Sequence, residues 1–580
     1  MKNKTVFRRL LRYLKVYRLQ LFFILLSSVV STVFMVFAPF VVGRVTTTLF
    51  ESITKGQFLW KKIVGLLMVL VVLYLISQLF SFLQGFGMAK ITARVMQRLR
   101  REIDEKMHRL KLNYYDTHTH GDMLSIITND VDTINQAISQ NLTSVVTQIT
   151  TAIGVFVMML AISPWLSLIP IVMVPLSLFS GAGVMKASEK YYGQQQELLG
   201  RLNGYIEEMY NGQSVVQVFN YQERARKAFA RLNAALKTSS QKAEITAGAI
   251  SPITTLVNDL GYVLCAAVGC LWAIAGKITT GNVQAMLEYT WRFAEPFSAI
   301  AGMVGSFGAA AAAGNRIFSL LDAEEEIPDR DSCVVPETCS GCVVFENVKF
   351  GYTPENLLMK DISLTVKPGQ KVAVVGPTGA GKTTLINLLM RFYELNGGSI
   401  SVDGVKTTDM SRKELRSRFG MVLQDTWLFE GTIGENIAYG KDGVKKEKII
   451  EAAKSACAHD FIKTLPGGYD MVLGKGAENI SQGERQLLTI ARALVSDPEI
   501  MILDEATSNV DTHTEVLIQQ AMERLMKGRT SFVIAHRLST IRDADIILYM
   551  EDGDIKEVGS HGELMAKHGK YAALYRSQFA

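Results

Sequence analysis

Charged residues are scarce in this chain. Asp, Glu, Lys and Arg make up 20% of its 580 residues, whereas soluble proteins average about 25%. Hydrophobic residues account for 48% of the sequence, and the mean hydropathy is +0.17. This composition excludes one small soluble domain, a disordered chain and a collagen-like fibre, and it indicates that part of the chain lies in a lipid bilayer.

Cysteine is also rare, with six residues in the whole chain. These residues form no dense framework, which argues against a disulfide-stabilised secreted domain and favours a reducing compartment. Cys339 and Cys342 have the spacing of metal ligands and Cys333 lies nearby, but the sequence offers no obvious fourth ligand. We therefore expect three ordinary reduced thiols.

Basic residues outnumber acidic ones and give a net charge of +6. They concentrate near the N-terminus and between residues 90 and 111, in both cases beside an apolar run. This placement is typical of the cytoplasmic flanks of membrane spans rather than of a nucleic-acid surface. We predict a cytoplasmic N-terminus, a multi-pass protein of the cell membrane and no nucleic-acid partner.

Six apolar stretches are long enough to cross a bilayer, which takes about 20 residues. Their even number returns the chain to the side on which it starts. The polar connections at residues 90–140 and 186–249 are too long to be loops, so we expect the spanning helices to continue beyond the membrane. The predicted spans are residues 19–43, 63–89, 142–163, 165–185, 250–275 and 283–314.

The composition changes near residue 322, where acidic residues and a proline form a polar linker. Beyond residue 342, short β-branched runs alternate with helical patterns, which is typical of an α/β domain with a largely parallel sheet. We predict a six-helix, all-α transmembrane domain at 1–322 with long cytoplasmic helical extensions. A linker at 323–341 and a cytoplasmic α/β domain at 342–580 follow.

A glycine-rich loop joins the apolar strand pattern of residues 371–375 to a helical pattern. Its glycines let backbone N–H groups close around a phosphate, Lys382 can reach the β- and γ-phosphate oxygens, and the Thr383 hydroxyl can bind Mg²⁺. The spacing therefore predicts a P-loop ATPase domain with ATP and Mg²⁺ as its ligands. The loop residues are Gly376, Pro377, Thr378, Gly379, Ala380, Gly381, Lys382, Thr383 and Thr384.

Two carboxylates follow the apolar run 500–503, at the strand end where such sheets carry out phosphate chemistry. Asp504 is expected to hold the metal through water, and Glu505 to act as the base that orients or deprotonates the attacking water. The alternative is that both residues only cap the next helix. The upstream P-loop favours the catalytic interpretation.

Ser481 and Gly483 start a further helical pattern and could bind an anion at its N-terminus, although the same residues could form an ordinary capping box. Together with the P-loop and the run at 503–508, they resemble the nucleotide-binding domain of ABC transporters. Six spans with long helical extensions before one such domain resemble an ABC exporter half-transporter.

The resemblance implies roles for further positions. Tyr352 matches the aromatic residue that stacks on adenine, and Gln424 matches the glutamine that senses Mg²⁺. His536 matches the switch histidine at the γ-phosphate, and Asp511 matches a residue of the loop that acts across the dimer. Gln424 and His536 thus join Glu505 as catalytic residues. The implied metal ligands are Thr383, Gln424 and Asp504.

Three departures from the family pattern are visible. Ile480 replaces a common leucine, residues 509–510 replace a small-residue pair, and Lys475 stands where glutamate is frequent. None of these changes removes a catalytic group.

The resemblance also implies a dimer, because the serine–glycine helix of one copy completes the phosphate site of another. Residues 114–130 and 205–212 resemble the family's coupling segments, although either could be a solvated helical turn. The implied partner is a second half-transporter. The amino-acid sequence of residues 508–511 favours a heterodimer over a homodimer, and both are kept as alternatives.

Substrate identity is the least determined property. Asp259 lies inside the fifth apolar stretch, where an ionisable residue is either functional or satisfied by neighbouring helices. Glu288, Arg292 and Glu295 share a helical face, so internal pairing accounts for them. We predict ATP-driven export of an amphipathic small molecule, drug or lipid. The alternatives are a peptide exporter, a siderophore importer, or an ATP-gated regulatory membrane protein that does not pump.

Overall fold

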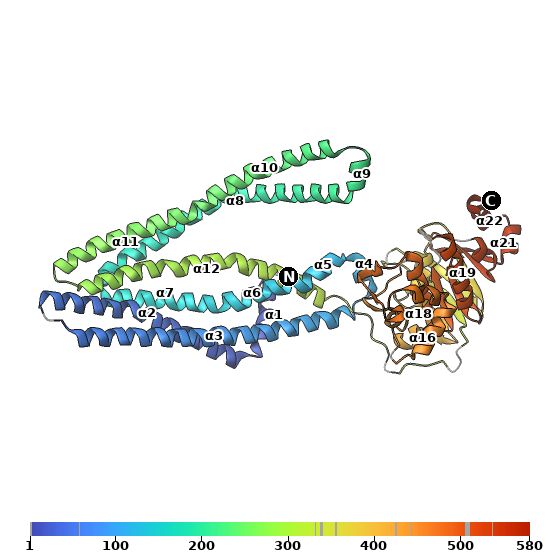
Figure 1. Ribbon diagram of the computed structural model, residues 1–580, viewed down its shortest axis with the longest axis horizontal. Helices are drawn as coiled ribbons and strands as arrows, with labels where there is room; N and C mark the ends of the chain where they lie inside the picture. Colours follow the sequence, from blue (N-terminus) through green and yellow to red (C-terminus); the bar gives the residue numbers. More distant parts are fainter. Residues whose placement is uncertain are drawn as a thin grey trace. The chain divides into compact units, whose positions relative to one another are not determined.

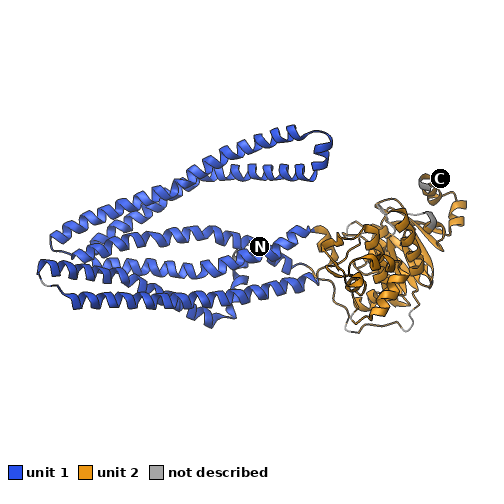
Figure 2. Cartoon of the chain, in the orientation of Figure 1, with its two compact units in different colours: residues 1–109, 118–323 blue, residues 110–117, 324–580 orange. Residues whose placement is uncertain are grey.

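The computed structural model describes residues 3–56, 58–330, 332–336, 340–353, 356–423, 426–441, 443–504, 511–535 and 538–579. Two compact units divide the chain (Figure 2). The first comprises residues 1–109 and 118–323, and the second comprises residues 110–117 and 324–580. The short segment 110–117 therefore belongs to the second unit although it lies between two parts of the first along the sequence.

The first unit contains only helices and the turns that join them among its described residues, as the apolar runs predict. Six of its helical stretches are long and apolar enough to cross a membrane. The spanning helices extend well beyond the length of a bilayer core. In Figure 1, α2, α3, α7 and α12 lie together, and α8, α10 and α11 form a second group that α9 closes at its tip. The helices are α1 (Asn3–Lys15), α2 (Arg18–Thr54), α3 (Trp60–Met107), α5 (His120–Ser125), α6 (Val131–Gln136), α7 (Leu142–Ile162), α8 (Pro164–Asn211), α9 (Gln213–Val218), α10 (Gln222–Gly248), α11 (Ile250–Ile274) and α12 (Thr280–Leu321), with π-helical turns at Ile126–Asp130 and Ala137–Asn141.

Local sequence explains where these helices start. Ser163 caps α8 through a hydrogen bond from the backbone N–H of Leu166, and Pro164 occupies the first helical position, where a missing N–H costs nothing. Thr279 caps α12 in the same way through Asn282. Ser163 follows the last residue of α7 directly, whereas four residues separate Thr279 from the end of α11 at Ile274, so each cap closes a short turn between consecutive spans.

The first and last spans meet at two glycines. A Cβ atom on Gly281 would lie 1.6 Å from the backbone oxygen of Gly43, so α2 and α12 approach each other here at backbone distance. The Gly281 N–H donates to Thr47 Oγ1 at 3.2 Å, and the buried Tyr289 hydroxyl donates to the Val36 carbonyl at 2.7 Å. This contact, which we call the α2–α12 junction, joins residues far apart in sequence.

The second unit is an α/β domain with two principal sheets. The six-stranded sheet has the order β12-β11-β3-β10-β9-β6, and every pairing in it except β11–β12 is parallel, which confirms the predicted parallel character. An antiparallel sheet of order β2-β1-β4-β5 lies beside it. The strands are β1 (Val343–Phe350), β2 (Met359–Val366), β3 (Lys371–Val375), β4 (Gly397–Val402), β5 (Val405–Lys406), β6 (Phe419–Val422), β7 (Gly431–Thr432), β8 (Val472–Leu473), β9 (Ile500–Asp504), β10 (Thr530–Ile534), β11 (Ile546–Glu551) and β12 (Asp554–Gly559).

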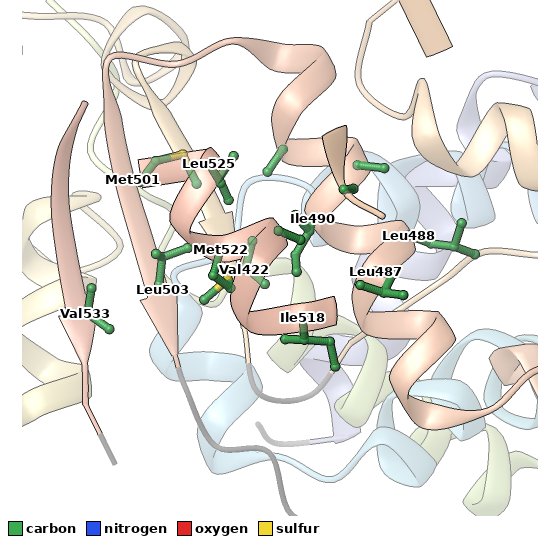
Figure 3. Packing of buried hydrophobic residues seen from close by; sticks show 14 of the residues in the cluster. Val422, Leu487, Leu488, Ile490, Met501, Leu503, Ile518, Met522, Leu525 and Val533 are labelled. Atoms are coloured by element: carbon green, nitrogen blue, oxygen red, sulfur yellow. The ribbon is translucent and has the colours of Figure 1, made fainter. Parts of the chain in front are cut away.

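Helices cover the six-stranded sheet and form the larger core of this unit. Figure 3 shows apolar side chains that fill the space between the sheet and two of these helices, α18 and α19. They include Leu487 and Ile490 of α18, Ile518 and Met522 of α19, and Leu503 of β9. This packing holds the carboxyl ends of β3, β9 and β10 in place. The helices are α4 (Leu112–Thr117), α13 (Lys382–Leu389), α14 (Arg412–Ser417), α15 (Ile433–Ile437), α16 (Lys446–Ser455), α17 (His459–Thr464), α18 (Gln482–Ser496), α19 (Thr512–Met526), α20 (Leu538–Arg542), α21 (His561–Ala566) and α22 (Lys570–Phe579), with 3₁₀ turns at Gly468–Asp470 and Lys475–Ala477.

Candidate functional site

The glycine-rich loop connects β3 to the N-terminus of α13, as its spacing predicts. Gly376, Gly379 and Gly381 have φ values of +152°, +83° and +94°, a region that side chains rarely adopt. A Cβ atom on Gly376 would also lie 2.1 Å from the backbone oxygen of Met550 on β11. The loop can therefore keep its shape only with glycine at these positions.

Lys382 is the first residue of α13, and its side chain turns back over the loop. Its Nζ donates to the carbonyl oxygens of Gly376 at 2.8 Å and Pro377 at 2.9 Å. Burial lowers the pKa of the Lys382 ammonium group, and the Asp504 carboxylate opposes that shift. The loop thus concentrates an ammonium group and backbone N–H groups at the start of a helix, an arrangement that binds phosphate.

A cavity of about 510 Å³ opens over this loop, a volume typical of small-molecule sites. The hydroxyl groups of Tyr352 and Thr384 lie 2.9 Å apart at its edge, and Asp504 enters it from the carboxyl end of β9. The Tyr352 side chain lines the cavity and is half exposed, so its ring is available to a flat ligand. The lining residues are Tyr352, Leu358, Thr378, Gly379, Ala380, Gly381, Lys382, Thr383, Thr384, Asp504 and Ile534.

Leu358 and Ile534 were not predicted as site residues. They are single apolar residues without a motif, and only the sheet topology brings them to the cavity wall. Tyr393 was also missed; its ring packs edge-on against that of Tyr352, with centroids 5.4 Å apart. Its hydroxyl donates to the Asp116 carboxylate of the 110–117 segment. The position of Tyr393, an aromatic residue four positions after the end of the P-loop helix α13, is the sequence signal that could have identified it as a site residue.

Ser481 begins α18 with a capping box. Its Oγ accepts from the Glu484 N–H at 3.3 Å, while the Glu484 carboxylate accepts from the Ser481 N–H at 2.8 Å. Gly483 is buried in the same first turn. Asp511 caps α19, and the hydrogen bonds from Thr514 lower the pKa of its carboxyl group. In the described part of this single chain, Ser481, Gly483 and Asp511 are not among the residues that line the cavity.

Three predicted catalytic residues, Gln424, Glu505 and His536, lie outside the described residues, and so does Cys339. The chain around them is described on both sides. Residue 504 ends β9, and residue 534 ends the neighbouring parallel strand β10. The roles of these three side chains stay predictions.

Fold and site together define a class of protein. A strand, a glycine loop with its lysine, and a helix form a phosphate-binding site in one unit, and the other unit carries six helices able to span a membrane. This combination is a multi-pass membrane protein with a fused P-loop nucleotide-binding domain.

Comparison with known proteins gives the family. Residues 21–293 match the family model of the ABC transporter transmembrane region, and residues 359–508 match the family model described as ABC transporter. The chain belongs to the ABC transporter family, with both regions fused in one polypeptide, as its motifs predict. ATP binding and coupled hydrolysis follow from this membership at the level of the family.

Two relatives and one solved structure illustrate the similarity. The chain is 45% identical over 507 residues to a fatty acid ABC transporter ATP-binding/permease protein of Mycobacterium bovis, covering 87% of this chain and 80% of that protein. It is 36% identical over 511 residues to an ATP-dependent lipid A-core flippase of Syntrophus aciditrophicus, covering 88% and 85% respectively. A bacterial Atm1-family ABC exporter solved with ATP bound matches with a TM-score of 0.74 and 27% identity, covering 98% of this chain and 99% of that one.

Proposed function

We propose that this chain is one half of a dimeric exporter of the cell membrane that uses ATP hydrolysis to move an amphipathic lipid outward. The observation that carries the ATPase part is the cavity over the P-loop, in which Lys382, Thr383 and Asp504 converge. We place the N-terminus and the nucleotide-binding domain in the cytoplasm, because basic residues flank the first span. The proposed division is a transmembrane domain at 1–322, a linker at 323–341 and a nucleotide-binding domain at 342–580.

The described residues fit ATP and Mg²⁺. The loop N–H groups and Lys382 hold the phosphates, while the Thr383 hydroxyl and the Asp504 carboxylate offer the oxygen ligands that Mg²⁺ prefers. Mg²⁺, when bound, supplies positive charge that offsets the charge developing on the phosphate oxygens. We assign Glu505 as the base for the attacking water.

Other residues complete the proposed site. Gln424 is assigned as a further metal contact and His536 as the contact to the γ-phosphate. Ser481 and Gly483 of a partner chain would close the site from the opposite side with the N-terminus of α18, because that turn lies outside the cavity of its own chain. Asp511 would act in the same interface.

Tyr352 provides a test of the adenine position. Tyr352→Ala should weaken ATP binding about 5- to 150-fold, because stacking of a base on an aromatic ring contributes roughly 1–3 kcal/mol. Tyr352→Phe should bind nearly as well as the wild type, since it keeps the ring and loses only the hydroxyl contact with Thr384. Equilibrium binding of a fluorescent ATP analogue measures both affinities. Equal weakening in both variants would assign the effect to the hydroxyl rather than to stacking.

The substrate class is inferred from an apolar pocket in the first unit. Its volume is about 460 Å³, and it lies between α7, α8 and α12, well inside the spans. Phe156 and Phe293 stack at 6.2 Å, and Phe297 meets Phe293 edge-on at 5.4 Å, which gives the pocket aromatic walls. A wholly apolar site suits an acyl chain, and the two relatives are named for a fatty acid and for lipid A-core. The lining residues are Phe156, Ile171, Val174, Pro175, Leu178, Phe179, Ala182, Phe293 and Phe297.

Filling this pocket tests the substrate class. Leu178→Trp should reduce stimulation of ATP hydrolysis by long-chain fatty acids or phospholipids about tenfold, because the larger ring occupies the space of the acyl chain. Leu176→Trp is the matched control, since Leu176 lies on the same helix, is exposed and does not line the pocket. Phosphate release is measured in nanodiscs with and without added lipid. Equal stimulation in the two variants would remove the pocket from the substrate path.

The transport cycle and the partner are tested together by the mass and ATP turnover of the purified chain in nanodiscs. Turnover by a dimer of this chain would establish a homodimer, and a silent monomer would favour the heterodimer. Stimulation by a peptide or by a siderophore instead of lipid would favour the alternative cargoes. Tight ATP binding by a dimer without turnover would favour an ATP-gated regulator that does not pump.

A further inference from the structure

A cluster of buried charges joins the linker to residues that follow the P-loop helix α13 in the sequence, between Arg391 and Arg412. Arg412, the first residue of α14, donates to the Asp329 carboxylate at 2.8 Å, to the Ile327 carbonyl at 2.6 Å and to the Glu394 carboxylate at 2.7 Å. Its Nε lies 3.5 Å from Glu326. We call these linker contacts, together with Arg391, the linker clasp.

Arg391 is the second arginine of the linker clasp. Its Nε donates to the Glu394 carboxylate at 2.9 Å, and its Nη1 lies 3.6 Å from the Asp329 carboxylate. The same Nη1 donates to two backbone carbonyls, those of Thr407 at 3.2 Å and Met410 at 3.3 Å. The Arg391 backbone has a φ of +52°, which is unusual for a residue with a side chain, so these contacts hold a strained conformation.

The linker clasp is shielded from water. The Arg391 and Arg412 side chains are only 7% and 11% exposed, and the Asp329 carboxylate is 32% exposed. Removing one partner from such a group leaves the remaining charge uncompensated, so the members tend to move together. Farther along the linker, Arg330 pairs with Asp409, and the Val334 N–H donates to the Asp409 carbonyl at 2.9 Å. The linker is therefore fastened to this unit at successive points.

The linker clasp is connected to the nucleotide site through one short helix. α13 runs from Lys382 in the phosphate site to Leu389, and the Arg391 N–H still bonds to the Leu388 carbonyl at 3.0 Å. At the other end, α12 stops at Leu321, five residues before Glu326. A shift of the P-loop helix can thus reach the last membrane-spanning helix through a few tightly bonded residues.

We infer that the linker clasp transmits the nucleotide state of the P-loop to α12, with Glu326 and Asp329 as positioning residues. This inference rests on the proposed function, because it requires ATP at the P-loop. Phosphate binding fixes the N-terminal end of α13, the clasp carries that change to residues 326–329, and the linker then restrains α12. A linker that served only as a tether would need none of these buried ion pairs.

Hydrogen exchange of the full wild-type chain in nanodiscs tests the inference without any substitution. A non-hydrolysable ATP analogue with Mg²⁺ should slow amide exchange in the P-loop peptide and also, by about threefold or more, in the peptide that spans residues 324–334. Protection of the P-loop alone would overturn the inference and leave the proposed ATP site intact. Protection of neither peptide would overturn the proposed site and the inference with it.

The double variant Glu326→Gln/Asp329→Asn keeps the size of both side chains and removes their charge. It should keep the nucleotide protection of the P-loop, lose that of the linker, and lose lipid stimulation while basal ATP hydrolysis stays within about twofold of wild type. Asp497→Asn is the control, since it removes the charge of an ion pair with Arg529 elsewhere in the same unit. If the double variant does not fold, Glu326→Gln replaces it, because Glu326 makes the longer contacts of 3.5 and 3.7 Å. Wild-type linker protection and stimulation in the variant that folds would overturn the inference.

Discussion

Replacing Glu505 with glutamine is expected to lower ATP turnover about 10²- to 10⁴-fold, the range that a general base contributes. The amide keeps the size of the carboxylate and can still hydrogen-bond to water, but it cannot accept a proton from that water. ATP affinity should stay close to that of the wild type, because the phosphates are held by the P-loop and Lys382. Phosphate release and equilibrium binding of ATP, measured on the same preparation in nanodiscs, separate the two effects.

A matched control is available just before the same strand. Glu499 directly precedes β9, at the end opposite to Asp504, and only its backbone carbonyl bonds to Thr530 among the contacts described. Glu499→Gln should therefore turn over ATP at the wild-type rate. Hydrolysis at the wild-type rate by Glu505→Gln would show that another group activates the water, and loss of ATP binding in that variant would show a structural role.

Gly281→Ala is expected to destabilise the membrane unit by about 3 kcal/mol, the upper end of the usual cost of overpacking. The new methyl group would lie 1.6 Å from the Gly43 oxygen and 2.3 Å from Thr47 Oγ1. A backbone carbonyl in the middle of a helix cannot rotate away, so α2 and α12 must separate and the Tyr289 bond to Val36 is strained or lost. Thermal unfolding of the detergent-solubilised protein measures this loss.

Gly302→Ala distinguishes this clash from a general effect of alanine in α12. Nothing lies within 4 Å of a Cβ atom at Gly302, and alanine is the better helix former by up to about 1 kcal/mol. This variant should be as stable as the wild type or slightly more stable. If Gly281→Ala unfolds at the same temperature as Gly302→Ala, the close approach of α2 and α12 does not contribute to stability.

The sequence was most informative where a feature depends on neighbouring residues. Long apolar runs predicted six spans, and the spacing from Gly376 to Thr383 predicted the P-loop, because both follow from local chemistry. The helical ends were less predictable: α2 continues to Thr54, well beyond the uncharged stretch that ends at residue 43. A helix that extends past the bilayer has no change of composition to mark its end.

Features that depend on distant pairing were not predicted. The antiparallel sheet that joins β1, β2, β4 and β5 was missed because its strands come from separate parts of the sequence. Arg391 and Arg412 look like surface residues in the sequence, and only the fold brings them to Asp329. In the site, Lys382 and Asp504 were predicted from motifs and do share one cavity, whereas Leu358 and Ile534 could not be found without the sheet topology.

The discontinuous second unit has a consequence for folding during synthesis. Residues 110–117 belong to that unit, with Leu110 bridged to Glu325 and Asp116 bonded to Tyr393. They leave the ribosome more than 200 residues before their partners do, so contacts of such long sequence separation form late. A nucleotide-binding domain produced separately from residue 324 onward would lack this segment and leave the Tyr393 hydroxyl without its carboxylate. Completion of this domain therefore depends on a part of the chain that is made before most of the membrane spans.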